Sequence, residues 1–207
     1  MMTPGTPRLT RLNDQLFTSA DLPQWDGRAW SAELDRWEAL GITHVVDNRI
    51  EASDLDLLAE YAPAITYLEN GADDAGQRMP DAWFDRGVDF TLEAMADPSA
   101  KVHVHCHMGI NRGPSMAFAV LLATGMSPAA GVRTIRDARP RAAIGYAGDA
   151  LSWWHRRSSA SAVQRRQQRT QLRAFWAANP HHTVRVIQEV RDEEMRGLLE
   201  AAAIDRG

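Results

Sequence analysis

The one cysteine of the chain, Cys106, stands at the end of a short β-branched run and six positions before Arg112. The loop between them has Gly109 in its middle, and an apolar stretch that predicts a buried helix starts at Pro114. A strand, a loop and a helix in this order point backbone N–H groups at an anion, and the loop should lower the thiol pKa by stabilising the thiolate. Arginine can donate two parallel hydrogen bonds to phosphate. The segment therefore predicts a nucleophile beside a phosphate receptor.

The pattern His-Cys-x-x-Gly-x-x-Arg, formed by His105, Cys106, Gly109 and Arg112, resembles the signature loop of the cysteine-dependent protein tyrosine phosphatases, most closely their dual-specificity branch. This resemblance covers residues 9–154. It implies that Cys106 attacks phosphorus while Arg112 and the loop amides hold the phosphate oxygens. The predicted phosphate-binding residues are His107, Met108, Gly109, Ile110, Asn111 and Arg112. A buried structural cysteine and a rhodanese-type sulfur-transfer loop are the rival interpretations, but the latter usually has fewer residues between cysteine and arginine.

A phosphatase of this kind also needs an acid that protonates the leaving oxygen. The polar loop of residues 69–79 contains Asp73 and Asp74. In the dual-specificity family the acid lies between a Tyr-Leu strand end and an aromatic-Phe pair that opens the next helix. With Tyr67-Leu68 and Trp83-Phe84 as these landmarks, Asp74 matches the position of the family's acid, and Asp73 is the alternative. Asp81 is better explained as an acid near a helix N-terminus.

Supporting residues are also implied by the resemblance. His105 is expected to orient the loop, with its ring N–H groups bonded to backbone carbonyls. Most of the family has Ser or Thr after the arginine, where this chain has Gly113, so Ser115 is the candidate substitute. Tyr146 and Ala147 stand where the family usually has a proline and an amide side chain.

No metal or other cofactor is predicted. The alternation of His103, His105 and His107 suggests a metal site, but His105 has a family role and a metal at His107 would disable the thiolate. Arg49 follows a strand and could touch the site, although an ion pair with Asp47 or Glu51 is at least as consistent with its position.

Strands and helices alternate over residues 9–154. This alternation predicts an α/β fold, protein tyrosine phosphatase-like, with a central mostly parallel sheet flanked by helices on both faces. A hairpin is expected over residues 9–18 with its turn at Asn13-Asp14, and Ser31 and Ser127 are expected to N-cap helices. We predict a catalytic domain over residues 1–154 and an arginine-rich helical extension over residues 155–207.

Composition limits the location and the partners. A hydrophobic content of 44% suffices for a core, and the chain has no apolar window long enough to span a membrane and no apolar region near Met1 typical of a secretion signal. One reactive cysteine suits a reducing compartment, so we expect a cytoplasmic protein. Residues 156–173 contain six arginines and no acid. They could bind an acidic surface or RNA, but a solvated helix face packed against the acidic domain is the stronger expectation.

The sequence thus predicts a phosphatase that hydrolyses phosphate monoesters through a cysteinyl-phosphate intermediate, with a phosphoprotein as the first choice of substrate. A phosphoinositide is less favoured because the loop has no lysine. The pair Asn111-Arg112 also resembles the loop of RNA 5′-triphosphatase relatives, so an RNA 5′ end is an alternative. A module that binds phosphate with weak or no turnover is the second alternative. The oligomeric state is left open.

Overall fold

The structure, a computed structural model, describes residues 9–23 and 27–204. Residues 1–8 of the predicted catalytic domain and residues 205–207 of the predicted extension lie outside the described residues. The strands are β1 (Leu9–Arg11), β2 (Leu16–Ser19), β3 (His44–Asp47), β4 (Thr66–Glu69) and β5 (Val102–His105). The helices are α1 (Gly27–Leu40), α2 (Leu55–Tyr61), α3 (Asp81–Met95), α4 (Arg112–Ala123), α5 (Pro128–Ala138), α6 (Ala147–Arg157), α7 (Ala162–Ala178) and α8 (Thr183–Ile204).

The five strands form one sheet in the order β1-β2-β5-β3-β4, in which only the β1–β2 pair is antiparallel. The predicted α/β architecture with a mostly parallel sheet is therefore confirmed. The predicted hairpin is present as well, because Asn13 Oδ1 accepts hydrogen bonds from the backbone N–H groups of Gln15 at 2.9 Å and Leu16 at 2.8 Å. The parallel strands all end at one edge of the sheet, where ligands bind in folds of this class.

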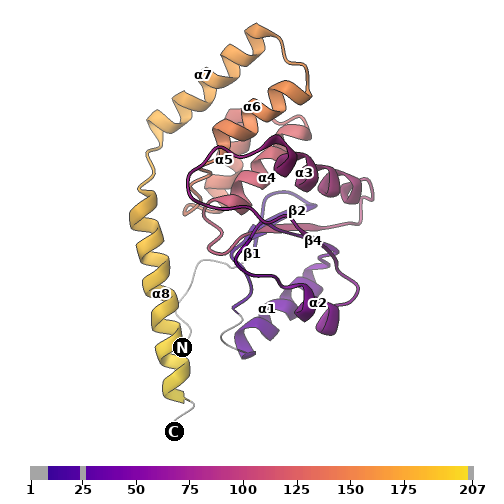
Figure 1. The fold of residues 1–207 in the computed structure, drawn as a ribbon, viewed down its shortest axis with the longest axis vertical. Helices are drawn as coiled ribbons and strands as arrows, with labels where there is room; N and C mark the ends of the chain where they lie inside the picture. The colour runs from indigo at the N-terminus through magenta and orange to yellow at the C-terminus, as the bar shows by residue number, and fades with distance from the viewer. Residues whose placement is uncertain (1–8, 24–26, 205–207) are drawn as a thin grey trace.

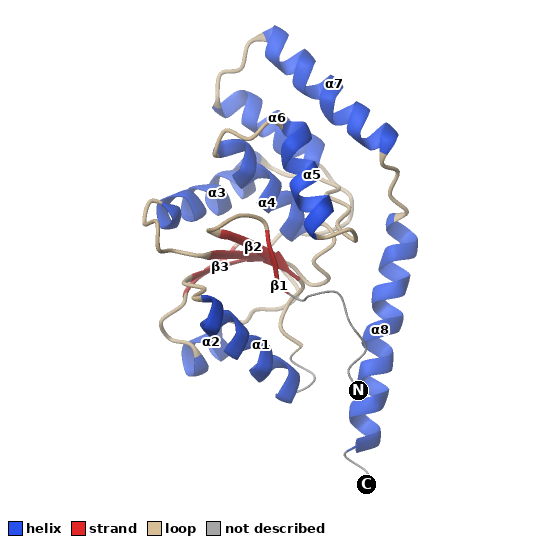
Figure 2. Cartoon of the chain, turned by 180° about the vertical axis from the view of Figure 1, so that it is seen from behind, coloured by secondary structure: helices blue, strands red, loops and turns tan. Residues whose placement is uncertain are grey.

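Helices cover both faces of the sheet, with α1 and α2 on one side and α3 to α6 on the other (Figures 1 and 2). Alternate strand residues enter two separate hydrophobic clusters, as the two-residue period of a strand requires. Val46 and Val104 pack into the larger cluster under α3 to α6, whereas Val45 and Phe17 pack into the smaller one around Trp37 of α1. The central strand β5 is therefore packed on both faces of the sheet, and this packing holds the start of the loop that follows it.

Two predicted helix starts are wrong and one is right. The first helix begins at Gly27, so Ser31 lies inside α1 rather than at its N-cap. The helix after the cysteine loop begins at Arg112, two residues before Pro114, with Asn111 as its N-cap. Ser127 does N-cap α5, because its side chain accepts a hydrogen bond from the N–H of Ala130.

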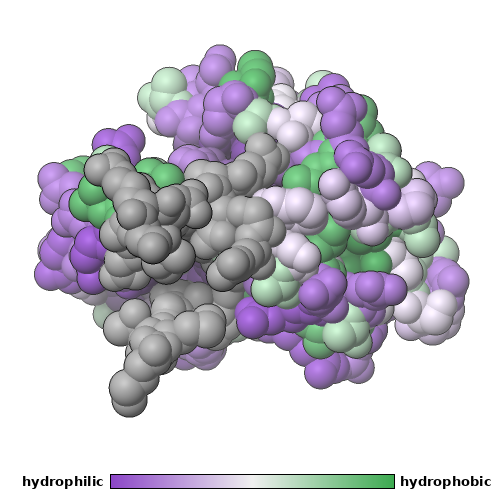
Figure 3. Space-filling view, turned by 90° about the horizontal axis from the view of Figure 1, so that it is seen from below, coloured by the Kyte–Doolittle hydropathy of each residue, from purple (hydrophilic) through white to green (hydrophobic). Residues whose placement is uncertain are grey.

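The C-terminal helices extend beyond the α/β body. Helix α6 continues to Arg157, past residue 154 where the composition changes, and α7 packs on α5 while α8 runs along one side of the molecule (Figure 1). On the face seen from below, hydrophobic side chains are interrupted by hydrophilic ones (Figure 3). Within the described ranges, none of the helices has the length and apolarity needed to cross a bilayer.

Candidate active site

The cysteine loop, residues 106–111, connects the end of β5 to the start of α4 at the ligand-binding edge of the sheet. Gly109 at its centre has φ +61°, a left-handed conformation that glycine adopts easily. A side chain at this position would also overlap the backbone of Ser19, because a Cβ on residue 109 would lie only 2.5 Å from the Ser19 carbonyl group. Both the turn and the close packing therefore require glycine at this position.

Cys106 lies at the floor of this loop and is 2% exposed. Burial raises the pKa of the Cys106 thiol above its usual value, and the backbone N–H groups of Gly113 and Gly109 together with the Arg112 guanidinium oppose that rise. The prediction that the loop lowers the pKa of this thiol is therefore wrong. The pKa is raised, because desolvation outweighs the groups that favour the thiolate. The groups that would stabilise a thiolate nevertheless surround the sulfur as predicted.

Arg112 is 4% exposed, and its guanidinium is held by the Glu51 carboxylate and by two backbone carbonyls, of which that of Asn48 accepts from Nη1 at 3.2 Å. Nη1 donates to Glu51 Oε2 at 2.7 Å and to the carbonyl of Ala72 at 2.9 Å, and Nη2 donates to Glu51 Oε1 at 2.5 Å. Nε has no hydrogen-bond partner among the described residues, although it is buried. This arrangement orients the guanidinium and leaves one buried donor for a ligand.

Glu51 was not predicted as a site residue. Of the two ion-pair partners expected for Arg49, Asp47 is the one that the structure has, whereas Glu51 pairs with Arg112. The Arg112 hydrogen bonds lower the pKa of Glu51 to about 2. Arg49 instead contacts Asp47 at 2.6 Å, Asp54 at 2.8 Å and Asp21 at 2.9 Å. Arg49 is therefore a buried structural cation, as the alternative reading of its position stated.

Both aspartates are exposed, but only Asp74 bonds to the cysteine loop through its side chain, whereas Asp73 contributes its backbone carbonyl to Gln77. Asp74 Oδ1 accepts hydrogen bonds from Asn111 Nδ2 at 2.6 Å and from the Tyr146 hydroxyl at 2.8 Å. Its other oxygen, Oδ2, lies 3.6 Å from Arg112 Nε. Of the two carboxylates, only Asp74 lies next to Arg112.

Tyr146 is a site residue that sequence reasoning treated only as a departure from the family pattern. Its hydroxyl donates to Asp74 and accepts from the backbone N–H of Gly76, while its own N–H donates to Ser115 Oγ at 3.2 Å. Burial is the main reason that the pKa of Tyr146 is raised to about 12, so the hydroxyl stays a donor at neutral pH. Tyr146 thus ties the Asp74 loop to the start of α4.

Ser115 and Gly113 lie in the first turn of α4, behind the cysteine. Ser115 is fully buried and accepts the hydrogen bond from Tyr146. A Cβ on Gly113 would lie 2.9 Å from the carbonyl carbon of His105, so the backbone next to Cys106 leaves no room for a side chain. Gly113 therefore allows its N–H to approach the Cys106 sulfur closely.

Arg139 supports the loop from below and was not predicted. It is 4% exposed, and its Nε donates to the carbonyl of Gly109 at 2.6 Å while Nη2 donates to that of Met108 at 3.3 Å. Burial lowers the pKa of Arg139 to about 10, which leaves it charged at neutral pH. By binding these two carbonyls, Arg139 keeps them turned away from the site, where they would repel an anion.

The three alternating histidines do not converge on one point. The rings of His103 and His105 stack with their centroids 5.0 Å apart inside the body, while His107 Nδ1 contacts Asp21 Oδ2 at 2.8 Å near the surface. Neither ring nitrogen of His105 has a hydrogen-bond partner among the described residues, so its expected bonds to backbone carbonyls are not formed. His105 Nε2 lies 3.9 Å from both Asp47 and Asp54.

His105, Asp47 and Asp54 are close enough together to be considered as metal ligands. The Arg49 guanidinium already lies between the two carboxylates, with Nη2 at 2.6 Å from Asp47 and 2.8 Å from Asp54. A guanidinium in this position neutralises the carboxylates and occupies the space that a cation would take. This cluster is best explained as the support beneath the loop.

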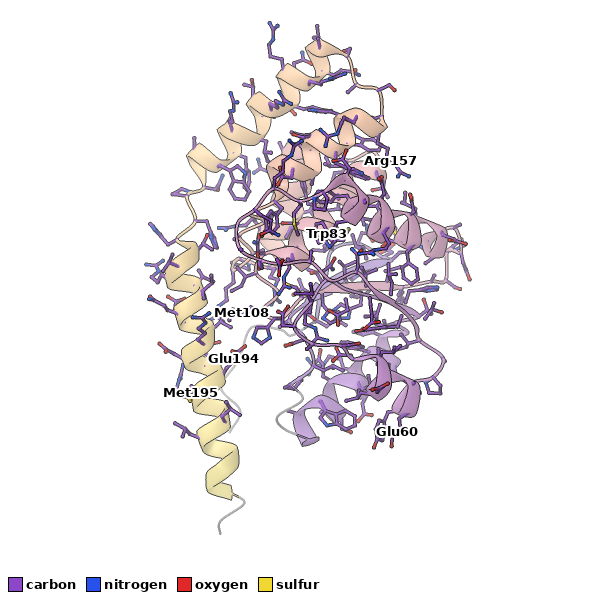
Figure 4. All side chains as sticks on the ribbon, in the orientation of Figure 1. Glu60, Trp83, Met108, Arg157, Glu194 and Met195 are labelled. Atoms are coloured by element: carbon purple, nitrogen blue, oxygen red, sulfur yellow. The ribbon has the colours of Figure 1, made fainter. Side chains whose placement is uncertain are left out.

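Helix α8 passes the same side of the body as the loop, where Met108 and Glu194 lie near each other (Figure 4). Arg141 forms a two-bond ion pair with Glu193 at 2.6 and 2.7 Å, which fastens α8 to the segment after α5. The pKa of His107 is raised mainly by its hydrogen bond to Asp21, and the negative charge of Glu194 on α8 raises it further. The predicted extension therefore borders the mouth of the site.

The chain has the dual-specificity phosphatase-like fold of the protein tyrosine phosphatases. Its cysteine loop lies at the carboxyl edge of a mostly parallel sheet that has helices on both faces. Human DUSP28 superposes with a TM-score of 0.60 at 20% identity, over 76% of this chain and 99% of that one. PTPMT1 in complex with PI(5)P gives a TM-score of 0.60 at 16% identity, over 73% and 97%. DUSP15 gives 0.58 at 19% identity, over 78% and 95%. No protein-family model matches the chain.

Proposed function

We propose that this protein is a phosphatase that hydrolyses phosphate monoesters, with phosphoproteins as its first class of substrate. The observation that carries the proposal is Nε of Arg112, which is buried at the end of the loop that holds Cys106, 3.6 Å from Asp74 Oδ2, and has no hydrogen-bond partner among the residues that the structure describes. A buried donor without a partner is costly, and a phosphate oxygen would satisfy it. The likeness in fold to dual-specificity phosphatases agrees with this reading.

In the first chemical step the Cys106 thiolate attacks phosphorus, an S–P bond forms and the P–O bond to the leaving group breaks. The loop amides and Arg112 bind the equatorial oxygens and stabilise their charge in the transition state. The proton for the leaving oxygen comes from Asp74. Because Oδ1 of Asp74 accepts from both Asn111 and Tyr146, we assign this proton to Oδ2, the oxygen that faces Arg112.

In the second step Asp74 Oδ2 accepts a proton from water, the water oxygen bonds to phosphorus and the S–P bond breaks. The departing thiolate needs donors, and the N–H groups of Gly113 and Gly109 point at the sulfur. These amides take the role that a Ser or Thr hydroxyl after the arginine has in most of the family. Ser115 supports this step indirectly, because its hydroxyl holds the backbone of Tyr146.

Burial of Cys106 favours the second candidate function, a module that binds phosphate with little turnover, because a neutral thiol is a poor nucleophile. Turnover of p-nitrophenyl phosphate separates the two. The proposal expects hydrolysis that is lost in Cys106→Ser, while inorganic phosphate still binds that variant. Binding of phosphate without hydrolysis by the parent protein would establish the binding module instead.

A further inference from the structure

The six arginines between residues 156 and 173 divide into two groups. Arg156 donates from Nε to Asp81 Oδ2 at 2.6 Å, and Arg157 bonds to Asp85 at 3.1 Å and to Asp89 at 2.5 Å on α3. For these two the expected packing against the acidic domain is what the structure has. The other four lie on α7 and form no ion pair with any carboxylate of the residues that the structure describes.

Arg165, Arg166, Arg169 and Arg173 line one shallow surface of α7 together with Ala162 and Thr170. We call these six residues the arginine stripe. All four arginines are exposed, and within residues 9–23 and 27–204 none of them forms an ion pair with a carboxylate. Arg165 uses its Nε to bind the carbonyl of Ala160, which leaves its two terminal nitrogens outward.

The positive charge of the stripe is not cancelled locally. Helix α7 contains no Asp or Glu, and three acidic residues of α3 are already paired with Arg156 and Arg157: Asp81, Asp85 and Asp89. The buried His155 beneath α7 responds to this charge: burial lowers its pKa, and Arg169 and Arg165 lower it further. Four like charges on one helix face repel one another, so the stripe costs stability unless an anion binds.

We propose that the arginine stripe binds the phosphodiester backbone of a nucleic acid strand. Arg165 and Arg173 are eight residues apart, about 12 Å along the helix. A strand whose bases stack as in a duplex carries one phosphate per about 3.4 Å of axis, so about four phosphates of a stacked single strand span this length. Four guanidinium groups thus meet about four phosphates, each able to donate two parallel hydrogen bonds.

The composition of the stripe argues against other anionic partners. A helix that binds at a membrane surface inserts large apolar residues between its basic ones, and Ala162 and Thr170 are the only other members here. Binding of a protein segment depends on buried aromatic or aliphatic anchors, which the stripe also lacks. Contacts with a phosphate backbone need neither, and they carry no sequence preference.

The test is fluorescence anisotropy of a labelled 20-nucleotide single-stranded RNA titrated with the full chain at several salt concentrations. With about four phosphates neutralised, log K should fall against log salt with a slope of about −2.8, or about 50-fold in affinity between 50 and 200 mM. Replacing three arginines in Arg165→Gln/Arg169→Gln/Arg173→Gln should weaken binding at 50 mM at least about tenfold and reduce the slope to about −0.7. Glutamine keeps the helix propensity, so α7 should persist.

A matched variant, Arg133→Gln/Arg185→Gln/Arg191→Gln, removes the same charge from exposed positions on α5 and α8. It should bind RNA like the parent, and both triple variants should keep the turnover of p-nitrophenyl phosphate. Equal losses in the two variants would overturn the proposal, because net charge alone would then explain binding. So would absence of binding at 50 mM, or tighter binding of poly-glutamate or of phosphatidylserine vesicles than of RNA. Single-stranded DNA should bind about as well as RNA, since only the backbone is contacted.

Discussion

The Tyr146 hydroxyl and the Asn111 amide both donate to the same oxygen of Asp74, at 2.8 and 2.6 Å. Three segments far apart in the chain meet at this oxygen: the loop after β4, the cysteine loop and the segment before α6. Asn111 Oδ1 in turn accepts from the N–H of Gly145 at 2.6 Å, which closes the network. The carboxylate is thereby held with one oxygen fixed and the other directed toward Arg112.

Removing the tyrosine hydroxyl should impair catalysis through Asp74 rather than through folding. A hydrogen bond to a charged group contributes about 1.5–3 kcal/mol, so Tyr146→Phe should lower kcat by about 10- to 100-fold for phenyl phosphate. The loss should be small for p-nitrophenyl phosphate, whose leaving group needs little protonation. A leaving-group series measures this difference. Equal losses for all leaving groups would show that Tyr146 is merely structural.

Asp74→Ala should lower turnover of alkyl phosphates by about two to four orders of magnitude, the usual contribution of a general acid–base group. Asp73→Ala is the matched control one residue away, and its side chain is exposed with no part in the network. Steady-state kinetics on both variants decide the assignment. If Asp73→Ala shows the larger loss, the acid has been placed one residue too late.

The ion pair between Glu51 and Arg112 should make stability depend on pH. The pKa of Glu51 is lowered to about 2, so its stabilising contribution is present above its unfolded pKa of about 4.5 and is lost as pH falls toward 2. The Glu51 side chain is 44% exposed, and solvent screening reduces the contribution to about 1 kcal/mol. Urea unfolding at pH 6 and pH 3 should show this loss in the parent and a smaller one in Glu51→Gln. Identical pH dependences would contradict the pairing.

Gly113→Ala should disrupt the cysteine loop, because the added Cβ would lie 2.9 Å from the carbonyl carbon of His105. We expect it to abolish turnover and to lower Tm. Gly148→Ala on α6 is the control, since a Cβ there meets nothing within 4 Å and alanine should stabilise the helix by about 0.5–1 kcal/mol. An active Gly113→Ala protein with an unchanged melt would show that the loop can shift to admit a side chain.

The cysteine loop could be predicted from the sequence because all of its parts are contiguous. The hydrophobic run, the cysteine, the glycine and the arginine lie within residues 102–112, and their order alone specifies a strand, a turn and a helix. That Asp74 rather than Asp73 bonds to the cysteine loop agrees with the aromatic landmarks that flank its loop. The sheet followed from the alternation of apolar strands and amphipathic helices, whose periods differ.

The supporting residues could not be read in this way, because contacts between distant segments leave no spacing signal. Glu51 and Arg112 are 61 positions apart, and Arg139 and Gly109 are 30 apart. In the sequence, Arg139 precedes Pro140, and this pair indicated only the end of a helix. A cation next to a helix end is usually exposed, so nothing indicated that this one would be buried under the loop.

The direction of the Cys106 pKa also depends on the three-dimensional surroundings. The sequence predicted the N-terminus of a helix, the backbone amides of the loop and Arg112 near the sulfur, and each of these favours the thiolate. The burial of the sulfur, which is 2% exposed, depends on how segments distant in the chain pack around the loop, such as Ser19 against Gly109, and no sequence spacing predicts such contacts. The desolvation that raises this pKa was therefore missed.

The central claim is that phosphate passes through a covalent bond to Cys106. Acid quenching of the enzyme during turnover of p-nitrophenyl phosphate, followed by peptide mass spectrometry, tests it directly. The account predicts a phosphoryl adduct on the peptide that contains Cys106, and neither adduct nor turnover in Cys106→Ser. Turnover that continues in a folded Cys106→Ser protein, or an adduct on any other residue, would contradict it.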